Sequence, residues 1–232
     1  MKIALLGYGK MGKIIEQVAL SRGHEIVLRK TSSNTFDGLE NADAAIDFSI
    51  PDAAASNISE CLHTNVPIVS GTTGWLSQYE SMASLCKEKK GAFIYGSNFS
   101  LGVNIFFELN AHLAKIMSKF DQYKVSMQEI HHTQKLDAPS GTAITLAKDI
   151  IENSGYESWV LENAASNQIA IDAKRIENVP GTHTVCYDSS IDAIEIKHTA
   201  HNREGFALGA VLAAEWIVGK KGVFTMKDVL SI

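Results

Sequence analysis

Residues 129–143 combine several side chains that can carry protons. His131 and His132 are adjacent, and Lys135 follows four residues after the first histidine. Imidazole and ammonium groups are common acids in enzymes, and one positioned acid typically contributes about 10²–10⁴ in rate. Because successive residues of a strand point to opposite faces, the two histidines are expected to differ in role. One is expected to donate a proton while the other contacts substrate or packs, and Lys135 either pairs with a carboxylate or acts as a second acid.

The same segment ends where a helix is expected to begin. Ser140 is a natural N-cap, and Gly141 and Thr142 would form the first turn. The helix is indicated by apolar residues at helical spacing, with Gly155 at its end: Ala143, Leu146, Ala147, Ile150 and Ile151. A helix N-terminus presents free N–H groups and a partial positive charge, so this turn is predicted to hold a substrate carboxylate. Taken alone, the segment also fits an ordinary cap beside surface histidines.

A second pattern indicates a dinucleotide. Residues 7–12 read Gly-Tyr-Gly-Lys-Met-Gly between a predicted strand and a predicted helix. In such a loop the first glycine makes the turn, the second lets a pyrophosphate approach the backbone, and the third lets helix and strand pack closely. The prediction is that the whole loop contacts the cofactor: Gly7, Tyr8, Gly9, Lys10, Met11 and Gly12.

The choice of nicotinamide cofactor depends on the end of the second predicted strand. NAD-preferring sites usually carry an acid about 20 residues after the glycine loop, whereas this chain has Arg29 and Lys30 followed by three hydroxyl residues. Two cations could receive a 2′-phosphate, which favours NADPH without excluding NADH. The competing interpretation is that Arg29, Lys30 and the hydroxyl residues form a solvated loop that contacts no cofactor. Two further loops follow predicted strands and are expected to contact the nicotinamide end of the cofactor. Each could also be a plain polar loop. The residues are Gly71, Thr72 and Thr73 in the first loop, and Gly96, Ser97, Asn98 and Phe99 in the second.

Alternating apolar runs and amphipathic stretches must position these loops. Strands are predicted at 3–6, 25–28, 44–48, 66–69 and 92–95, with helices near 11–19 and 76–89. This order predicts an α/β fold, a Rossmann-like doubly wound parallel sheet whose ligands bind at the carboxyl ends of the strands. After a helix near 104–117 the pattern changes to clustered strands, at 123–130, 168–172, 182–187 and 193–198, which are expected to be antiparallel.

The change of pattern predicts two domains. A dinucleotide-binding domain is expected over 1–99 and 204–232, since the apolar helix near 206–219 can pack back on the first sheet. An α+β domain for substrate binding and oligomerisation is expected over 100–203.

Composition excludes several classes of protein. The chain of 232 residues is 45% hydrophobic and 20% charged, which is typical of a soluble globular protein. A net charge of −5 gives no basic field for nucleic acid, and no run approaches the roughly 18 apolar residues that span a bilayer. Three scattered cysteines without a CxxC pair argue against a structural zinc site and for a reducing compartment. A cytoplasmic location is expected.

The segment of residues 131–143, His-His-Thr-Gln-Lys-Leu-Asp-Ala-Pro-Ser-Gly-Thr-Ala, resembles the signature of the dihydrodipicolinate reductases. Residues 71–74 and 98–104 resemble that family's cofactor-contacting loops, and residues 198–210 resemble its closing segment. The similarities therefore extend from the first strand to the last long helix. Little resemblance is found between residues 155 and 181, where Arg175 lies. Arg175 and the nearby His183 could reach the site, but neither is assigned a role.

The resemblance implies a reaction and a set of roles. The reaction is NAD(P)H-dependent reduction of a cyclic dicarboxylic imine, derived from 4-hydroxy-tetrahydrodipicolinate, to tetrahydrodipicolinate in diaminopimelate and lysine biosynthesis. By resemblance, His131 is the proton donor and Lys135 a further acid, while His132, Gly141 and Thr142 hold the substrate carboxylates. A homotetramer joined through the second domain's sheet is also implied. The acid often found at the end of the second strand is replaced by Thr31, so cofactor preference stays open.

Three other kinds of protein would share part of this pattern. An amino-acid dehydrogenase would share the glycine loop but has no need of the His-His-Lys-Pro-Ser-Gly-Thr constellation. A non-catalytic NAD(P)-sensing protein would bind dinucleotide without turnover. A metal enzyme using His131 and His132 is disfavoured, because the side chains of adjacent strand residues diverge and no third ligand is evident. No metal is expected.

Overall fold

The computed structural model describes residues 1–232, which divide into two compact units. The first unit is formed by Met1–Leu101 and Arg203–Ile232, and the second by Gly102–Asn202. The chain thus leaves the first unit once and returns to it through helix α6 (Glu204–Ile217). The function of each unit stays a prediction.

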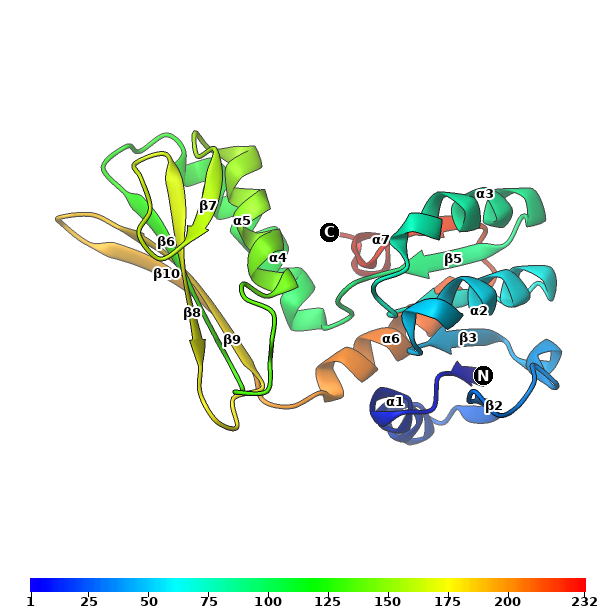
Figure 1. The fold of residues 1–232 in the computed structure, drawn as a ribbon. Helices are drawn as coiled ribbons and strands as arrows, with labels where there is room; N and C mark the ends of the chain where they lie inside the picture. The colour runs from blue at the N-terminus through cyan, green and yellow to red at the C-terminus, as the bar shows by residue number, and fades with distance from the viewer. The chain divides into compact units, whose positions relative to one another are not determined.

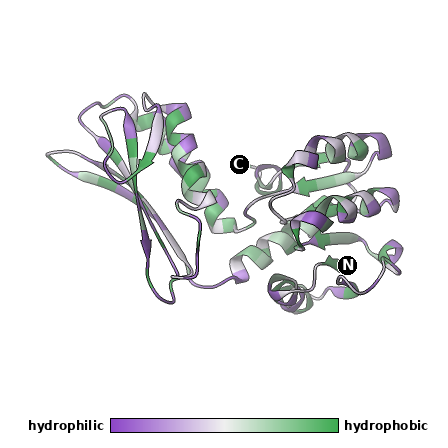
Figure 2. Ribbon diagram, viewed as in Figure 1, coloured by the Kyte–Doolittle hydropathy of each residue, from purple (hydrophilic) through white to green (hydrophobic).

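The first unit is built on a six-stranded parallel sheet in the order β11-β5-β4-β3-β1-β2 (Figure 1). Its strands are short and mostly apolar, as strands buried on both faces must be (Figure 2). The predicted Rossmann-like sheet is confirmed, and it gains one edge strand that the sequence analysis did not predict, β11. The strands are β1 (Lys2–Leu6), β2 (Glu25–Lys30), β3 (Ala44–Asp47), β4 (Ile68–Ser70), β5 (Ala92–Tyr95) and β11 (Gly222–Phe224).

Helices cover both faces of this sheet. On one face, α1 (Lys10–Ser21), α6 and the short α7 (Met226–Leu230) bury residues such as Ile15, Val211 and Met226 against the strands. On the other face, α2 (Pro51–His63) and α3 (Tyr79–Lys89) pack residues such as Ile58 and Cys86. The helix expected over 76–89 begins with a separate 3₁₀ turn, η2 (Leu76–Gln78), and another 3₁₀ turn, η1 (Leu39–Asn41), precedes β3. None of the helices has the length and hydrophobicity that crossing a bilayer requires.

The second unit contains a five-stranded sheet in the order β10-β9-β6-β8-β7. The expectation of antiparallel strands is only half right: β9 pairs antiparallel with β6 and β10, whereas β8 pairs parallel with β6 and β7. The parallel pairing of β6 and β8 is possible because helix α5 crosses over between them. The elements are α4 (Leu101–Met117), β6 (Lys124–His131), α5 (Gly141–Asn153), β7 (Ser158–Leu161), β8 (Gln168–Arg175), β9 (Gly181–Asp188) and β10 (Ala193–Ala200).

One face of this sheet carries the core of the second unit. Helices α4 and α5 bury Phe106, Ala114 and Leu146 against strand residues such as Met127 and Ile171. Strand β7 was not predicted because it is only four residues long and none of its residues is fully buried, so it has no clear apolar pattern. Strand β10 has mostly exposed side chains, so the sheet face opposite the helices is open within one chain.

Candidate active site

Strand β6 places Glu129 and His131 on the helix-covered face of the second sheet. Residues alternate along the strand, so Met127, Glu129 and His131 share one face. Glu129 is fully buried and His131 is 7% exposed. A carboxyl and an imidazole thus replace hydrophobic side chains at the end of an otherwise apolar strand face, and they require partners there.

Glu129 receives those partners from two other elements. One carboxylate oxygen accepts a hydrogen bond of 2.9 Å from the Ser140 N–H, directly before α5. The other oxygen accepts from both terminal nitrogens of Arg175, at the end of β8, each at 3.2 Å. Burial alone would raise the pKa of this carboxyl, but the nearby His183 ring and the Ser140 hydrogen bond hold it at about 2. Glu129 is therefore a buried, permanently charged carboxylate at neutral pH.

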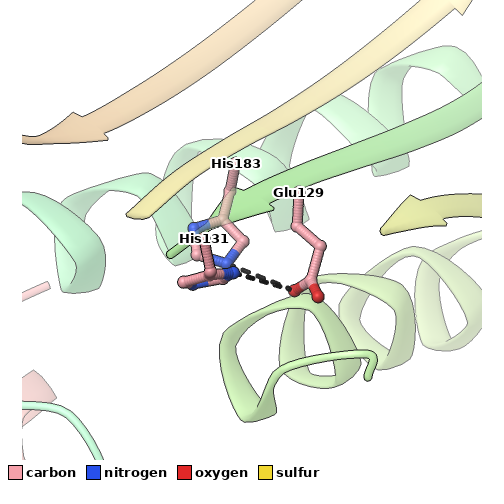
Figure 3. A group of neighbouring side chains, drawn as sticks. All are labelled: Glu129, His131 and His183. Carbon is pink, nitrogen blue, oxygen red and sulfur yellow. Dashed lines mark ion pairs between the residues drawn. The ribbon is translucent and has the colours of Figure 1, made fainter. Parts of the chain in front are cut away.

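His131 lies next to this carboxylate together with His183 of β9 (Figure 3). The His131 Nδ1 is 3.8 Å and the His183 Nε2 is 3.7 Å from the same Glu129 oxygen, and the two ring centroids are 5.0 Å apart. Burial has the largest effect on His131 and the neighbouring His183 ring the next largest, and together they lower its pKa to about 4, although Glu129 opposes this shift. His131 is therefore uncharged near pH 7, and its buried Nδ1 has no hydrogen-bond partner.

The three side chains also have the composition of a metal site. One ligand atom from each of Glu129, His131 and His183 lies within 4.8 Å of the others. His132 is not part of this group, so these residues do not form a site with both adjacent histidines; strand β9 instead brings His183 beside His131. However, the Glu129 carboxylate is already neutralised by Arg175, and the His183 Nε2 lies 3.0 Å from the Ser140 hydroxyl. Two of the three side chains are therefore already engaged, which fits a hydrogen-bonded network better than an open coordination site.

Arg175 also holds the loop that follows β6. Its guanidinium donates to the Asp137 carbonyl at 2.6 Å and to the Lys135 carbonyl at 3.3 Å. The Lys135 ammonium is paired with both oxygens of the Asp137 carboxylate at 2.8 Å. His132 lies just beyond the strand, half-buried, and its carbonyl accepts from the Lys135 N–H. The structure therefore brings His131, His132 and Lys135 to one strand end, but Lys135 is engaged with a neighbouring acid.

The start of α5 follows the predicted geometry. Ser140 is the N-cap, and its hydroxyl accepts from the Ala143 N–H at 3.2 Å. Ser140 is 3% exposed and is used entirely within the network, whereas Gly141 is exposed and Thr142 half-buried. The first turn of the helix carries no acidic residue. An anion can therefore approach the exposed backbone around Gly141.

The glycine loop of the first unit has the geometry of a phosphate cradle. Gly7 has a φ of +100°, and a Cβ there would overlap the Phe48 carbonyl, while a Cβ at Gly12 would overlap the Gly7 carbonyl. A Cβ at Gly9, by contrast, would meet no protein atom. No side chain caps the N-terminus of α1, which starts at the exposed Lys10 and half-buried Met11. The loop thus fits the pyrophosphate of a dinucleotide, with Gly9 facing open space.

A cleft of about 400 Å³ lies beside this loop. The carboxyl ends of β1, β2 and β3 form it, as expected for a doubly wound sheet. Lys30, Thr31 and Ser32 line it from the second strand, but Arg29 does not. Instead the Arg29 Nε donates to Glu16 of α1 at 2.9 Å, and the Tyr8 hydroxyl donates to the same carboxylate. The cleft has further lining residues that the sequence analysis did not identify: Phe48, Ser49, Ile50, Ala53 and Asn57.

The polar floor of this cleft is organised by Asp47 at the end of β3. Its carboxylate is fully buried and accepts hydrogen bonds of 2.6, 2.8 and 2.7 Å from Ser49, Asn57 and Ser70. Burial raises the pKa of Asp47, and these hydrogen bonds oppose the rise. Thr72 extends the network, because its hydroxyl accepts from the Ser49 N–H at 2.8 Å. An acid inside an otherwise apolar predicted strand was the signal that could have revealed this cluster.

The two other predicted cofactor loops follow β4 and β5. Gly71 lies against the ring of Phe48, where a Cβ would overlap the ring atoms. Thr72 is buried within the Asp47 network, while Thr73 is exposed. After β5, Ser97 is exposed and Gly96 and Asn98 are half-buried. Phe99 is buried and packs in the core with α6, so it supports the loop more than it faces a ligand.

Comparison with protein families identifies two adjoining matches. Residues 1–99 match the family model described as dihydrodipicolinate reductase, N-terminus, and residues 102–230 match the model described as dihydrodipicolinate reductase, C-terminus. The matches join at residues 99–102, next to the division between the two structural units.

Curated relatives and a solved structure agree with these matches. The 4-hydroxy-tetrahydrodipicolinate reductase of Christiangramia forsetii is 56% identical, covering 100% of this chain and 98% of the relative. The 4-hydroxy-tetrahydrodipicolinate reductase of Thermosipho africanus is 35% identical, covering 99% of this chain and 98% of the relative. The fold is similar to dipicolinate-bound dihydrodipicolinate reductase from Paenisporosarcina sp. TG-14, with a TM-score of 0.76, 22% identity and 97% coverage of each chain.

Proposed function

Because the chain belongs to the dihydrodipicolinate reductase family, we propose that it reduces 4-hydroxy-tetrahydrodipicolinate, by way of dihydrodipicolinate, to tetrahydrodipicolinate with NAD(P)H. It would serve diaminopimelate and lysine biosynthesis, as an oxidoreductase. The observation that carries the proposal is the convergence of His131, a buried carboxylate and the N-terminus of α5 at one strand end. A dicarboxylate needs anion sites, and its reduction needs a proton donor beside them.

The glycine loop is the proposed pyrophosphate site. Gly7 and Gly12 allow the tight turn and the close packing of the loop, Gly9 leaves the backbone open, and the uncapped N-terminus of α1 offers N–H groups to the phosphates. Tyr8, Lys10 and Met11 would contact the cofactor from the same turn. The loops at Gly71–Thr73 and Gly96–Phe99 would complete the nicotinamide end. When bound, the nicotinamide supplies the hydride, so the protein's own residues need to supply only orientation and the proton.

His131 is the proposed proton donor. In the protein alone its low pKa keeps the ring neutral, because burial and nearby positive groups disfavour the imidazolium. A substrate with two carboxylates brings negative charge to the site, which raises the pKa of a neighbouring imidazole. His131 would therefore take up a proton as substrate binds and pass it to the substrate during reduction. The fixed charge of Glu129 favours the same protonated form.

The remaining residues of the segment have proposed roles in substrate binding. Gly141 and Thr142 would hold one carboxylate at the start of α5, where N–H groups favour an anion. Ser140 supports that turn through its cap and its bond to Glu129. Lys135 would exchange its partner Asp137 for the second carboxylate or act as a further acid, and His132 would contact the substrate beside it.

Either nicotinamide cofactor fits the family, and we favour NADPH. Lys30, Thr31 and Ser32 line the cleft and could contact a 2′-phosphate, and no acid from that strand end would repel it. Arg29 is close to the same edge, although it is paired with Glu16.

We further propose a homotetramer in the cytoplasm. The face of the second sheet opposite α4 and α5 is open within one chain, and half-buried Cys186 lies on it beside the exposed Glu195 of the edge strand β10. A second copy packed on this face would cover it. The three cysteines are all free, as expected in a reducing compartment.

The test follows oxidation of NADPH and NADH at 340 nm, with substrate generated from pyruvate and aspartate semialdehyde by a synthase. Wild type should oxidise one or both cofactors only when substrate is present. His131→Gln and Lys135→Ala should each lower kcat/KM by about 10² or more. Dinucleotide binding without any oxidation would contradict the reductase proposal and favour an NAD(P)-sensing protein. Activity that survives thorough chelation would exclude a catalytic metal.

A further inference from the structure

We propose that Glu16 is a selectivity-determining residue that limits the preference of this enzyme for NADPH over NADH by holding Arg29. The inference rests on the proposed function only in assuming a nicotinamide dinucleotide as the ligand. Glu16 does not line the cleft, so it would act through Arg29 and through Tyr8 of the glycine loop. In this role it is a positioning residue and not a catalytic one.

Glu16 joins the two segments that surround the adenosine end of the proposed cofactor site. It lies on α1, and its carboxylate accepts from the Nε and one terminal nitrogen of Arg29, the residue before the end of β2. The same carboxylate accepts from the hydroxyl of Tyr8, the second residue of the glycine loop. The guanidinium carbon of Arg29 lies 5.9 Å from the centre of the Tyr8 ring. Three residues from three elements thus form one fixed unit.

The charge of Glu16 is secured by these contacts. The hydrogen bond from Arg29, followed by that from Tyr8, lowers the pKa of Glu16 below its ordinary value. Its side chain is only 13% exposed, whereas that of Arg29 is 43% exposed. The carboxylate therefore stays ionised and close to the guanidinium near neutral pH. Both Arg29 nitrogens donate to Oε1 of Glu16, and the Tyr8 hydroxyl donates to Oε2, so both carboxylate oxygens are engaged.

The consequence concerns the groups that remain for a 2′-phosphate. Lys30 lines the cleft, but its ammonium donates to the carbonyls of Thr31 and Asn34 at 3.0 and 2.9 Å. Arg29 directly precedes Lys30 at the end of β2, and its charge is balanced by Glu16. NADP differs from NAD by a 2′-phosphate of about −1.5 to −2 charges, which needs unbalanced cations or free donors. Glu16 therefore weakens the advantage of the phosphorylated cofactor and lets NADH compete.

The test replaces Glu16 by Gln, which keeps the shape of the side chain and removes its charge. The ratio of kcat/KM for NADPH to that for NADH should rise about tenfold, the effect of one added charge-assisted contact to the phosphate. The same shift should appear in calorimetric affinities for 2′-phospho-ADP-ribose and ADP-ribose, which need no turnover. An unchanged ratio in both measurements would overturn the inference.

Two further variants separate this role from general changes in charge or stability. Arg29→Gln leaves Glu16 unbalanced, so the ratio should fall below that of wild type. Adding Glu16→Gln to Arg29→Gln should then cancel that fall without raising the ratio above that of wild type. Glu215→Gln is the matched control, because Glu215 pairs with Arg22 at 2.8 Å in the same unit and does not line the cleft. A ratio that rises equally in Glu215→Gln, or fails to fall in Arg29→Gln, would show that Glu16 has no specific role.

The test also keeps this inference separate from the reductase proposal. If wild type turns over substrate but the ratio is unchanged in Glu16→Gln, the proposed function is supported and the role of Glu16 is refuted. If there is no turnover but the ADP-ribose affinities shift as expected, the role of Glu16 is supported and the reductase proposal is refuted.

Discussion

Glu129 and Arg175 form a buried ion pair that connects the ends of the two central parallel strands, β6 and β8. Both terminal nitrogens of Arg175 lie 3.2 Å from one oxygen of a carboxylate with no exposed surface. Arg175 is directly opposite His131 in the register of the two strands. The pair therefore fixes the strand end that carries the proposed proton donor, and it fixes the following loop through the carbonyls of Lys135 and Asp137.

Glu129→Gln should destabilise the second unit. Removal of one partner from a buried pair leaves an uncompensated charge, a change that typically costs about 3–5 kcal/mol. Arg175 is 21% exposed and keeps two carbonyl acceptors, so we expect about 3 kcal/mol, at the lower end of that range. Urea unfolding at pH 7.5 measures the change. Glu177→Gln, which removes an exposed carboxylate two residues after Arg175, is the control. Equal stability of the two variants would show that the pair contributes nothing.

The buried His131 should make stability fall in mild acid. Its pKa is about 4 in the folded protein and 6.5 as an ordinary histidine, so between these values only the unfolded chain binds the proton. Stability is therefore lost as the pH falls from 6.5 towards 4, by about 2 kcal/mol between pH 6.5 and 5. His131→Asn should flatten this part of the stability profile, while His63→Asn, an exposed site on α2, should not. A wild-type profile that is flat above pH 5 would refute the assigned shift.

Asp137→Asn should change substrate affinity more than stability. The Asp137 side chain is 61% exposed, and an exposed pair of this kind contributes about 0–1 kcal/mol to folding. Its carboxylate nevertheless competes with the proposed substrate for Lys135. The variant should therefore lower KM several-fold with little change in kcat, in the assay at 340 nm. A higher KM would instead mean that Asp137 is needed to orient Lys135 towards the substrate.

The sequence predicted the local parts of this site, but it gave no role to Arg175 and His183, which come from distant strands. The glycine loop, the Ser140 cap and the shared strand end of His131 and Lys135 follow from periodicity and from residue types close together in the chain. The presence of Glu129 on the same face as His131 also follows from the alternation of a strand. Arg175 and His183 reach the site only through the pairing of β6 with β8 and β9. Strand pairing over 40 or more residues has no local signal.

The mixed second sheet has the same explanation. A run of predicted strands favours antiparallel pairing, but helix α5 between β6 and β7 allows a parallel crossover. The contact between Arg29 and Glu16 was also hidden, because it joins the middle of a helix to the end of the next strand. The sequence therefore indicated Arg29 as a free cation, whereas the structure pairs it. Whether a cation beside a cleft is free to bind a ligand depends on which side chains pack against it, and residue type alone does not show this.

Gly9 and Gly7 offer a final prediction, because they differ in one measurable respect. A Cβ at Gly9 would meet no protein atom, whereas at Gly7, with its φ of +100°, it would overlap the Phe48 carbonyl. Gly9→Ala should therefore fold with a Tm close to that of wild type but lose dinucleotide affinity, since the methyl group would occupy the approach of the pyrophosphate. Gly7→Ala should lose stability whether or not cofactor is present. Thermal unfolding with and without NADPH distinguishes the two: cofactor should raise the Tm of wild type and not that of Gly9→Ala. If NADPH stabilised Gly9→Ala as strongly as wild type, the pyrophosphate would have to lie elsewhere than against this loop.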